Sequence, residues 1–190
     1  WKLIKLEADN LGLAFFATIG FQEDLDLLVD IGCDSIKIAS ADVNYNQLLR
    51  LAAKSGMNVQ LDTGNADIEE IKNAVNILEE EGCQSIIIHQ CPSGYPAHLP
   101  SVCLKMIPTL KKLFPKYPIA YSDHTPEADL DIAAVSLGAN LIEKTITLDR
   151  MTKSVEHVFS LEPNDMKSFI SRIRDVETAL GTEVRTIGNE

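Results

Sequence analysis

Six short runs of apolar residues recur along the chain, and each is followed by a segment with apolar residues at helical spacing. The runs are LAFFATIG (13–20), SIKIAS (35–40), NVQLDTG (58–64), SIIIHQC (85–91), PIAYSDHT (118–125) and NLIEKTIT (140–147). Runs of this length, bounded by turn residues, predict buried strands. Strands that alternate with helices predict a parallel sheet.

Amphipathic segments between these runs predict the helices. They span residues 22–32, 46–56, 67–82, 101–114 and 127–138. Three of the joints that lead from a helix into a strand share a glycine, at Gly32, Gly82 and Gly138. Because glycine readily adopts the left-handed conformation that ends many helices, we expect it to cap these three. The repeated βα unit is therefore the building block of the chain.

Polar residues gather at the carboxyl ends of nearly all the predicted strands. They are Thr18, Lys37, Ser40, Asp62, Thr63, Gln90, Ser93, Tyr95, Ser122, His124, Lys144 and Thr145. An open doubly wound sheet and a (β/α)8 barrel both suit a βα repeat. No GxGxxG or P-loop pattern appears, and a barrel builds its active site from the ends of many strands. The sequence therefore predicts an α/β fold of the TIM (β/α)8 barrel type.

Six strands do not close an eight-stranded barrel. The first ten residues read as the tail of a helix, so we expect the chain to enter the barrel partway round, with two βα units before it. We expect residues 1–181 to form this partial barrel. Residues 182–190 are expected to form a tail or the start of a linker.

Composition narrows the class of protein. The chain has 190 residues, and 45% are hydrophobic, which suits one substantial core. It contains no long apolar run and no apolar signal-peptide core, so we expect a cytoplasmic protein without membrane contact. A formal net charge of -11 repels nucleic acid, so an anionic substrate needs a local cluster of Lys and Arg. The four cysteines show no paired CxxC spacing, so we expect buried free thiols and not disulfides or a zinc site. They are Cys33, Cys83, Cys91 and Cys103.

The strand end YSDHT places a serine, an aspartate and a histidine where a packed core would close. Alternation along a strand puts Ser122 and His124 on one side and Tyr121 and Asp123 on the other. Ser122 and His124 are therefore candidate site residues, with a packed, hydrogen-bonded histidine as the alternative.

Two lysines and one loop are further candidates. Lys37 lies among apolar neighbours, where a lysine needs an anionic partner. It can bind phosphate or carboxylate, act as a Schiff-base amine, or extend its ammonium group from the rim of the strand. Lys144 is either a site residue or the partner of the adjacent Glu143 in a structural ion pair. The charged loop with Glu156 and His157 is either simply solvated or lies on the catalytic face of the barrel.

Six motifs occur in order along the chain: IKIAS, LDTG, QCPSGYPA, YSDHT, IEKTIT and SVEHVFSLEP. Together they resemble the sialic acid synthase family, which condenses phosphoenolpyruvate with an N-acylated hexosamine such as N-acetylmannosamine and releases phosphate. The resemblance implies strands three to eight of a (β/α)8 barrel, followed by a linker to a small C-terminal domain. It also implies a cytoplasmic transferase of carbohydrate biosynthesis that uses a divalent metal, Mn²⁺ or Mg²⁺, and forms a homodimer in its full-length form.

The resemblance also assigns roles by position. Lys37, His124 and Glu156 are the implied catalytic residues, and His124 matches a metal ligand. The residues that the resemblance places at phosphoenolpyruvate or the sugar are Thr18, Ser40, Asp42, Asp62, Thr63, Ser93, Tyr95, Ser122 and Lys144.

Three departures from the family pattern matter. The second metal histidine of the family is Thr145 here, so a metal would depend on His124 with Glu156, His157 or water. Asp62 stands where a phosphate-contacting serine is typical, and a carboxylate repels phosphate unless it is protonated or turned away. The two preceding strands would carry an essential acid and another phosphate lysine. Two alternatives stay open: a Schiff-base lyase or aldolase on a keto-sugar acid, and a non-catalytic barrel.

Overall fold

A computed structural model describes residues 1–184 as a six-stranded parallel sheet with helices around it. The strands are β1 (Phe16–Ile19), β2 (Ser35–Ile38), β3 (Asn58–Asp62), β4 (Ile86–Gln90), β5 (Ile119–Asp123) and β6 (Leu141–Lys144). The helices are α1 (Lys2–Asn10), α2 (Gln22–Asp30), α3 (Asn46–Lys54), α4 (Ile68–Glu80), α5 (Leu99–Val102), α6 (Met106–Leu113), α7 (Asp129–Ser136) and α8 (Pro163–Leu180), with short 3₁₀ turns η1 (Ser40–Asp42) and η2 (His157–Phe159).

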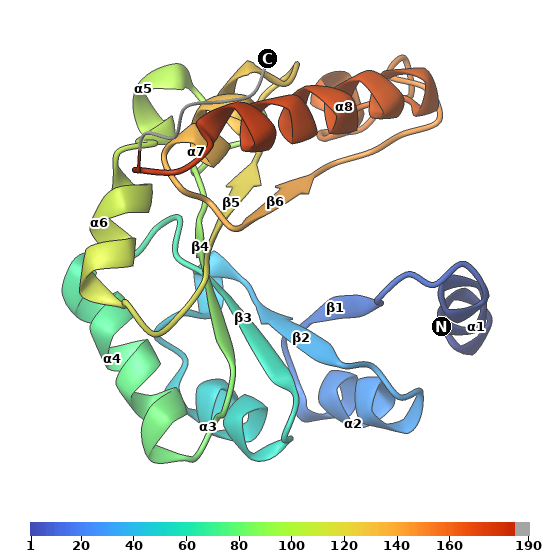
Figure 1. The fold of residues 1–190 in the computed structure, drawn as a ribbon. Coiled ribbons are helices and arrows are strands. Elements are labelled where there is room, and N and C mark those ends of the chain that lie inside the picture. Colours follow the sequence, from blue (N-terminus) through green and yellow to red (C-terminus); the bar gives the residue numbers. More distant parts are fainter. Residues whose placement is uncertain (185–190) are drawn as a thin grey trace.

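The sheet forms part of a barrel (Figure 1). Each strand pairs in parallel with the next one along the chain, so β1 and β6 are its two edges. Helices α2, α3, α4 and α6 cover the convex side of the curved sheet. The predicted partial (β/α)8 barrel is confirmed, and so are the six predicted strands. In the expected linker, residues 182–184 carry no helix or strand, and residues 185–190 lie outside the described residues.

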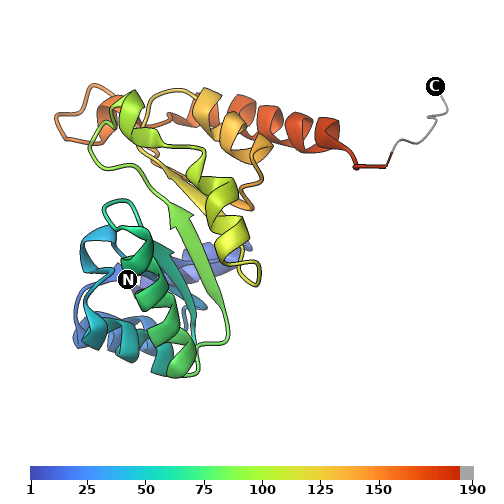
Figure 2. The ribbon, with the colours of Figure 1, turned by 90° about the vertical axis from the view of Figure 1, so that its left-hand side faces the viewer.

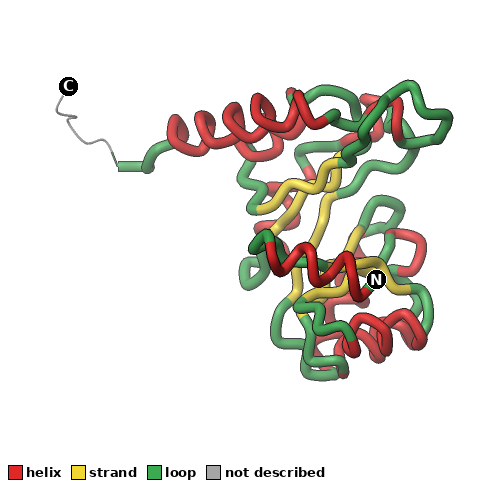
Figure 3. The backbone as a smooth tube through the Cα atoms, turned by 90° about the vertical axis from the view of Figure 1, so that its right-hand side faces the viewer, coloured by secondary structure: helices red, strands yellow, loops and turns green. Residues whose placement is uncertain are grey.

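Two helices stand apart from that convex layer. Helix α8 projects beyond the rest of the fold (Figure 2), and its Phe169 packs with Ala128 and Leu161 near α7. Helix α1 crosses in front of the strands when the molecule is seen from its open side (Figure 3) and buries none of its residues. Among the helices within residues 1–184, none combines the length and the apolar character needed to span a bilayer.

The helix-facing side of the sheet forms the apolar core. Ile36 and Ile38 on β2, Leu61 on β3 and Ile88 on β4 are all fully buried. Burying an aliphatic side chain of this size contributes about 1.5–3 kcal/mol. Because side chains alternate along a strand, the residues between them face the concave side of the sheet, where Lys37 lies.

The repeated helix-to-strand joints have the expected conformation. Gly32, Gly82 and Gly138 have φ angles of +74°, +88° and +97°, which confirms the predicted left-handed caps. The helix expected over 101–114 is instead two helices, α5 and α6, because Cys103 adopts a φ of +49° and breaks the helical path. Cys103 is also exposed, so its expected burial is wrong, whereas the other three cysteines are buried free thiols.

Lys144 belongs to a charged network on the helix-facing side of β5 and β6. Its Nζ forms an ion pair with Asp123, lies 3.2 Å from Asp131 and donates to the carbonyl of Thr125 at 2.7 Å. The hydroxyl of Tyr121 donates to Asp123 at 2.7 Å. Burial, followed by the charge of Asp123, raises the pKa of Asp131. The ammonium of Lys144 therefore compensates two carboxylates that no solvent reaches.

We expect Lys144→Met to destabilise the full-length natural protein by about 3–5 kcal/mol, because it leaves buried carboxylates without a counter-charge. Urea unfolding measures this loss. Arg174→Met is the matched control, since it removes an exposed ion pair with Glu177 and should leave the unfolding free energy nearly unchanged. Equal losses in the two variants would contradict the assigned role of Lys144.

Candidate active site

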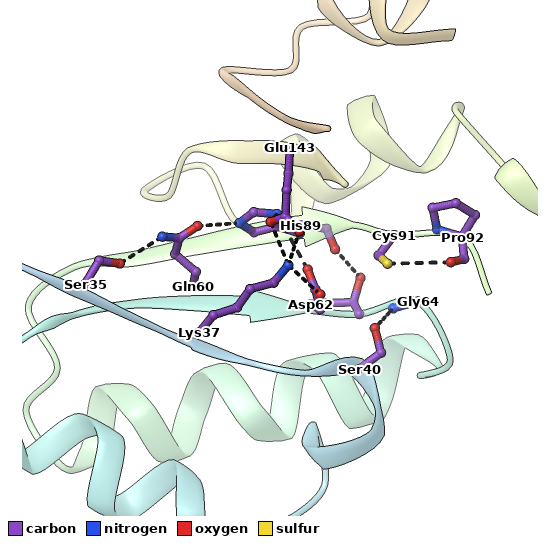
Figure 4. A network of polar contacts seen from close by, with 11 residues as sticks. Ser35, Lys37, Ser40, Gln60, Asp62, Gly64, His89, Cys91, Pro92 and Glu143 are labelled. Atoms are coloured by element: carbon purple, nitrogen blue, oxygen red, sulfur yellow. Dashed lines mark hydrogen bonds and ion pairs between the residues drawn. The ribbon is translucent and has the colours of Figure 1, made fainter. Parts of the chain in front are cut away.

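A buried lysine lies at the centre of the concave side of the sheet (Figure 4). Lys37 projects from β2, and only 6% of it is exposed. Its Nζ lies 2.9 Å from Oδ2 of Asp62, on the neighbouring strand β3. Both carboxylate oxygens of Glu143, on the edge strand β6, accept hydrogen bonds from the same nitrogen at 2.6 Å. The ammonium therefore joins strands β2 and β3 to the far edge of the sheet.

Burial disfavours the charged form of each group in this cluster, and the ion pairs offset that cost. Burial lowers the pKa of Lys37, but Asp62 and Glu143 outweigh it and raise the pKa overall. Burial raises the pKa of Asp62 to about 6, against the attraction of Lys37. For Glu143 burial acts in the same direction, but Lys37 prevails and lowers the pKa. One ammonium and two ionised carboxylates leave the cluster with a net negative charge.

His89 on β4 stands beside Asp62, its register partner on β3, and is fully buried. Its Nε2 lies 3.1 Å from Oε1 of Gln60, whose amide nitrogen donates to Oγ of Ser35 at 2.9 Å. Its Nδ1 has no hydrogen-bond partner and lies 3.5 Å from Oδ1 of Asp62 and 3.8 Å from Oε2 of Glu143. Burial above all lowers the pKa of His89 to about 4, so the ring is neutral near pH 7.

These contacts bring together the side chains that can hold a metal ion. Asp62, His89 and Glu143 each offer one ligand atom, and the three atoms lie within 4.8 Å of one another. Across residues 1–184, no other group of three or more His, Cys, Asp or Glu side chains meets this condition. Two carboxylates and an imidazole form a ligand set that divalent transition metals accept.

Three of the predicted hydroxyl groups lie close to this cluster. Thr18 on β1 is the register partner of Lys37 and is exposed. Ser40, in η1, accepts a hydrogen bond from the backbone N–H of Gly64 at 3.0 Å. Oγ of Ser122, on β5, is buried and has no hydrogen-bond partner. Ser122 is therefore a hydroxyl on this side of the sheet that the protein leaves unpaired.

The other predicted loop residues mainly hold the backbone. Oγ1 of Thr63 donates to the carbonyl of His89 at 2.7 Å, and Oγ of Ser93 donates to the carbonyl of Gly64 at 2.9 Å. Asp42, at the end of η1, is half-buried. Thr63 and Ser93 therefore shape the loops after β3 and β4 around the site.

The end of β5 carries the predicted histidine. His124 is 7% exposed, and its ring stacks on that of Tyr95 with centroids 4.3 Å apart. Burial lowers the pKa of His124, and its Nδ1 is buried without a partner. Oγ1 of Thr145 is also buried and unpartnered, whereas Glu156 lies exposed in the loop before η2. His124 therefore packs against the aromatic side chain of Tyr95, from the loop after β4.

Lys144 lies away from the Lys37 cluster, because adjacent residues of a strand face opposite sides of the sheet. The alternative ion pair between Lys144 and the adjacent Glu143 is wrong for the same reason. Glu143 pairs with Lys37 on the concave side, and Lys144 pairs with Asp123 and Asp131 behind the sheet.

The sequence prediction does not include His89. At the end of this strand it names Gln90 instead. Gln90 faces the helices, and its amide donates to a backbone carbonyl of α5 at 3.0 Å. The sequence holds a signal for the correct side. Lys37 is five residues after Gly32, and His89 is seven residues after Gly82, so alternation from the two similar joints puts both on one face.

Gln60 and Glu143 are also missing from the prediction. Gln60 is the register partner of Lys37, and Glu143 is the register partner of Ser122. Strand register brings these residues to the site, and apolar periodicity does not report register. The pairing of the strands determines their position at the site.

Comparisons with known proteins agree on one family. Residues 1–185 match the model of the NeuB family. N,N'-diacetyllegionaminic acid synthase of Campylobacter jejuni is 36% identical over 186 residues, which are 97% of this chain and 55% of that protein. Human N-acetylneuraminate-9-phosphate synthase is 32% identical over 188 residues, which are 98% of this chain and 52% of that protein.

A solved structure gives the same result. The crystal structure of N-acetylneuraminic acid synthetase from Leptospira borgpetersenii, in complex with citrate, matches with a TM-score of 0.92 and 33% identity over 98% of this chain and 65% of that chain. The chain spans about half the length of the curated relatives it matches. The family match nevertheless covers nearly all of its residues, and the chain therefore belongs to the NeuB family.

Proposed function

We propose that the full-length protein is a nonulosonic acid synthase that condenses phosphoenolpyruvate with an open-chain N-acylated amino sugar and releases phosphate. The relatives are synthases of sugar acids, which supports the class of reaction. The observation that carries the proposal is the buried ammonium of Lys37, with the hydroxyls of Thr18 and Ser122 on strands of the same sheet. A buried ammonium with nearby hydroxyls is suited to a phosphate or a carboxylate.

Binding an anion at this place requires a change within the cluster. Nζ of Lys37 already contacts the carboxylates of Asp62 and Glu143, and the cluster has a net negative charge when both are ionised. An incoming phosphate would be repelled unless a further positive charge enters or a carboxylate turns away. Glu143 is the more exposed of the two carboxylates, since 33% of its side chain is exposed against 10% for Asp62.

We assign the acceptor sugar to the side of the site formed by Tyr95 and His124. Tyr95 is about half exposed and stacks on the buried ring of His124, and its aromatic ring and hydroxyl suit the faces and hydroxyls of a sugar. The named relatives make different sugar acids, and the loop after β4 that carries Tyr95 offers residues that can set the choice of sugar. The acceptor class proposed here is an N-acylated hexosamine.

The metal site that the family resemblance implies does not fit its expected position. There His124 would share the ion with the residue at position 145, which is a threonine. A neutral hydroxyl is a much weaker ligand than an imidazole. No step of the proposed reaction is therefore assigned to an ion held by His124 and Thr145.

We expect the full-length natural protein, assayed with Mn²⁺, to release phosphate from phosphoenolpyruvate only when an N-acylated hexosamine is present. Lys37→Gln should lower kcat/KM by about 100-fold or more, because it removes the charge that holds the anion. Lys54→Gln is the control, since Lys54 is exposed at the end of α3. Phosphate release from none of a panel that includes N-acetylmannosamine would support a non-catalytic barrel instead.

The Schiff-base alternative needs a neutral amine on Lys37. Because Asp62 and Glu143 together raise the pKa of Lys37 despite its burial, we expect the group to remain an ammonium and to resist attack on a ketone. Treatment with borohydride in the presence of pyruvate, followed by peptide mass spectrometry, should find no adduct on Lys37. A reduced pyruvate adduct at this residue would contradict the phosphoenolpyruvate mechanism and favour a lyase.

A further inference from the structure

Two buried hydrogen-bond acceptors face each other beneath Lys37. Nδ1 of His89 lies 3.5 Å from Oδ1 of Asp62, and neither atom has a hydrogen-bond partner. His89 is fully buried and Asp62 is 7% exposed, so bulk water does not solvate either atom. Buried polar atoms are almost always paired, so this arrangement points to a cation between them.

The contacts of His89 in the structure suit a lone pair on the nitrogen that faces Asp62. The amide nitrogen of Gln60 donates to Ser35, which turns Oε1 of Gln60 towards Nε2 of His89 at 3.1 Å. An oxygen acceptor at this distance places the ring hydrogen on Nε2. Nδ1 is then free to act as a ligand. A histidine that ligates a metal usually donates its other N–H in this way.

We propose that Asp62, His89 and Glu143 bind a divalent cation such as Mn²⁺ between strands β3, β4 and β6. Nδ1 of His89 is 3.5 Å from the nearest oxygen of Asp62 and 3.8 Å from Oε2 of Glu143. Ligand atoms about 2.1 Å from one ion stand about 3 Å apart when they are neighbours in an octahedron. The three ligand atoms lie within 4.8 Å of one another, so an ion between them would draw all three side chains slightly inward.

Lys37 does not occupy this position. Its Nζ contacts Oδ2 of Asp62, which leaves Oδ1 of the same carboxylate for the cation. The carboxylate of Asp62 can therefore lie between the ammonium and the cation, whereas both oxygens of Glu143 contact Lys37 and one of them would be shared with the cation. The divalent charge also changes the charge of the cluster from negative to positive. An anion can then approach Lys37 without the repulsion that the two carboxylates otherwise exert.

This site uses different residues from the His124 and Thr145 positions that the resemblance implies. Asp62 and His89 are register partners on adjacent strands, so the backbone fixes two of the three ligands. The inference concerns binding of the cation alone. It stands apart from the proposed synthase reaction, because Mn²⁺ binding is measured without either substrate.

The test is a titration of the full-length natural protein with Mn²⁺, followed through the loss of the electron paramagnetic resonance signal of the free ion. We expect one bound ion per chain. Loss of an outer-sphere partner alone lowers metal affinity about 10- to 100-fold, so loss of a direct ligand in His89→Gln or Asp62→Asn should lower it by about 100-fold or more. Circular dichroism establishes that each variant is folded.

His124→Ala and Thr145→Val are the matched controls, and both should bind Mn²⁺ within about twofold of the natural protein. If His89→Gln does not fold, pulsed electron paramagnetic resonance of His124→Ala decides the question. Coupling to one imidazole nitrogen should persist in that variant. The proposal would be overturned by loss of this coupling or of binding in His124→Ala, or by full binding in His89→Gln. It would also be overturned if the natural protein bound no Mn²⁺, which would mean that a proton alone separates Asp62 and His89.

Discussion

The ion pairs that Lys37 makes with Asp62 and Glu143 organise the concave side of this partial barrel. They join β2 and β3 to β6, which within residues 1–184 pairs with β5. A lysine at this depth is stable only because carboxylates offset the loss of its hydration. Those carboxylates in turn set the charge that any substrate meets. Structure and chemistry at the site therefore depend on the same three side chains.

The two sides of the sheet handle buried charge differently. Behind the sheet, Lys144 is enclosed with Asp123 and Asp131, and their contacts are all with the protein. On the concave side, Asp62 and His89 keep unpaired atoms directed at each other. The oxygens of Asp131 also lack hydrogen-bond partners, but Oδ2 of Asp131 lies 3.2 Å from the ammonium of Lys144, whereas Nδ1 of His89 and Oδ1 of Asp62 face each other with no cation between them.

Much of the architecture could be predicted from the sequence because apolar periodicity reports burial directly. The six strands and the glycine caps follow from local patterns, and Lys37 is conspicuous as a charge within an apolar run. The partners of Lys37 were harder to predict, since Glu143 lies 106 residues away and reaches it only through the curvature of the sheet. His89 was missed although counting from Gly82 puts it on the same face as Lys37, and Lys144 was misplaced because its counter-charges come from another strand and a helix.

On this proposal, the interior of the barrel binds a cation and an anion through one charge cluster. Anomalous diffraction from crystals of the full-length protein grown with Mn²⁺ and phosphoenolpyruvate tests it most directly. We expect an anomalous peak within bonding distance of Nδ1 of His89, with Lys37 contacting the bound phosphoenolpyruvate. A peak at His124, with Nδ1 of His89 bonded only to protein, would contradict the account.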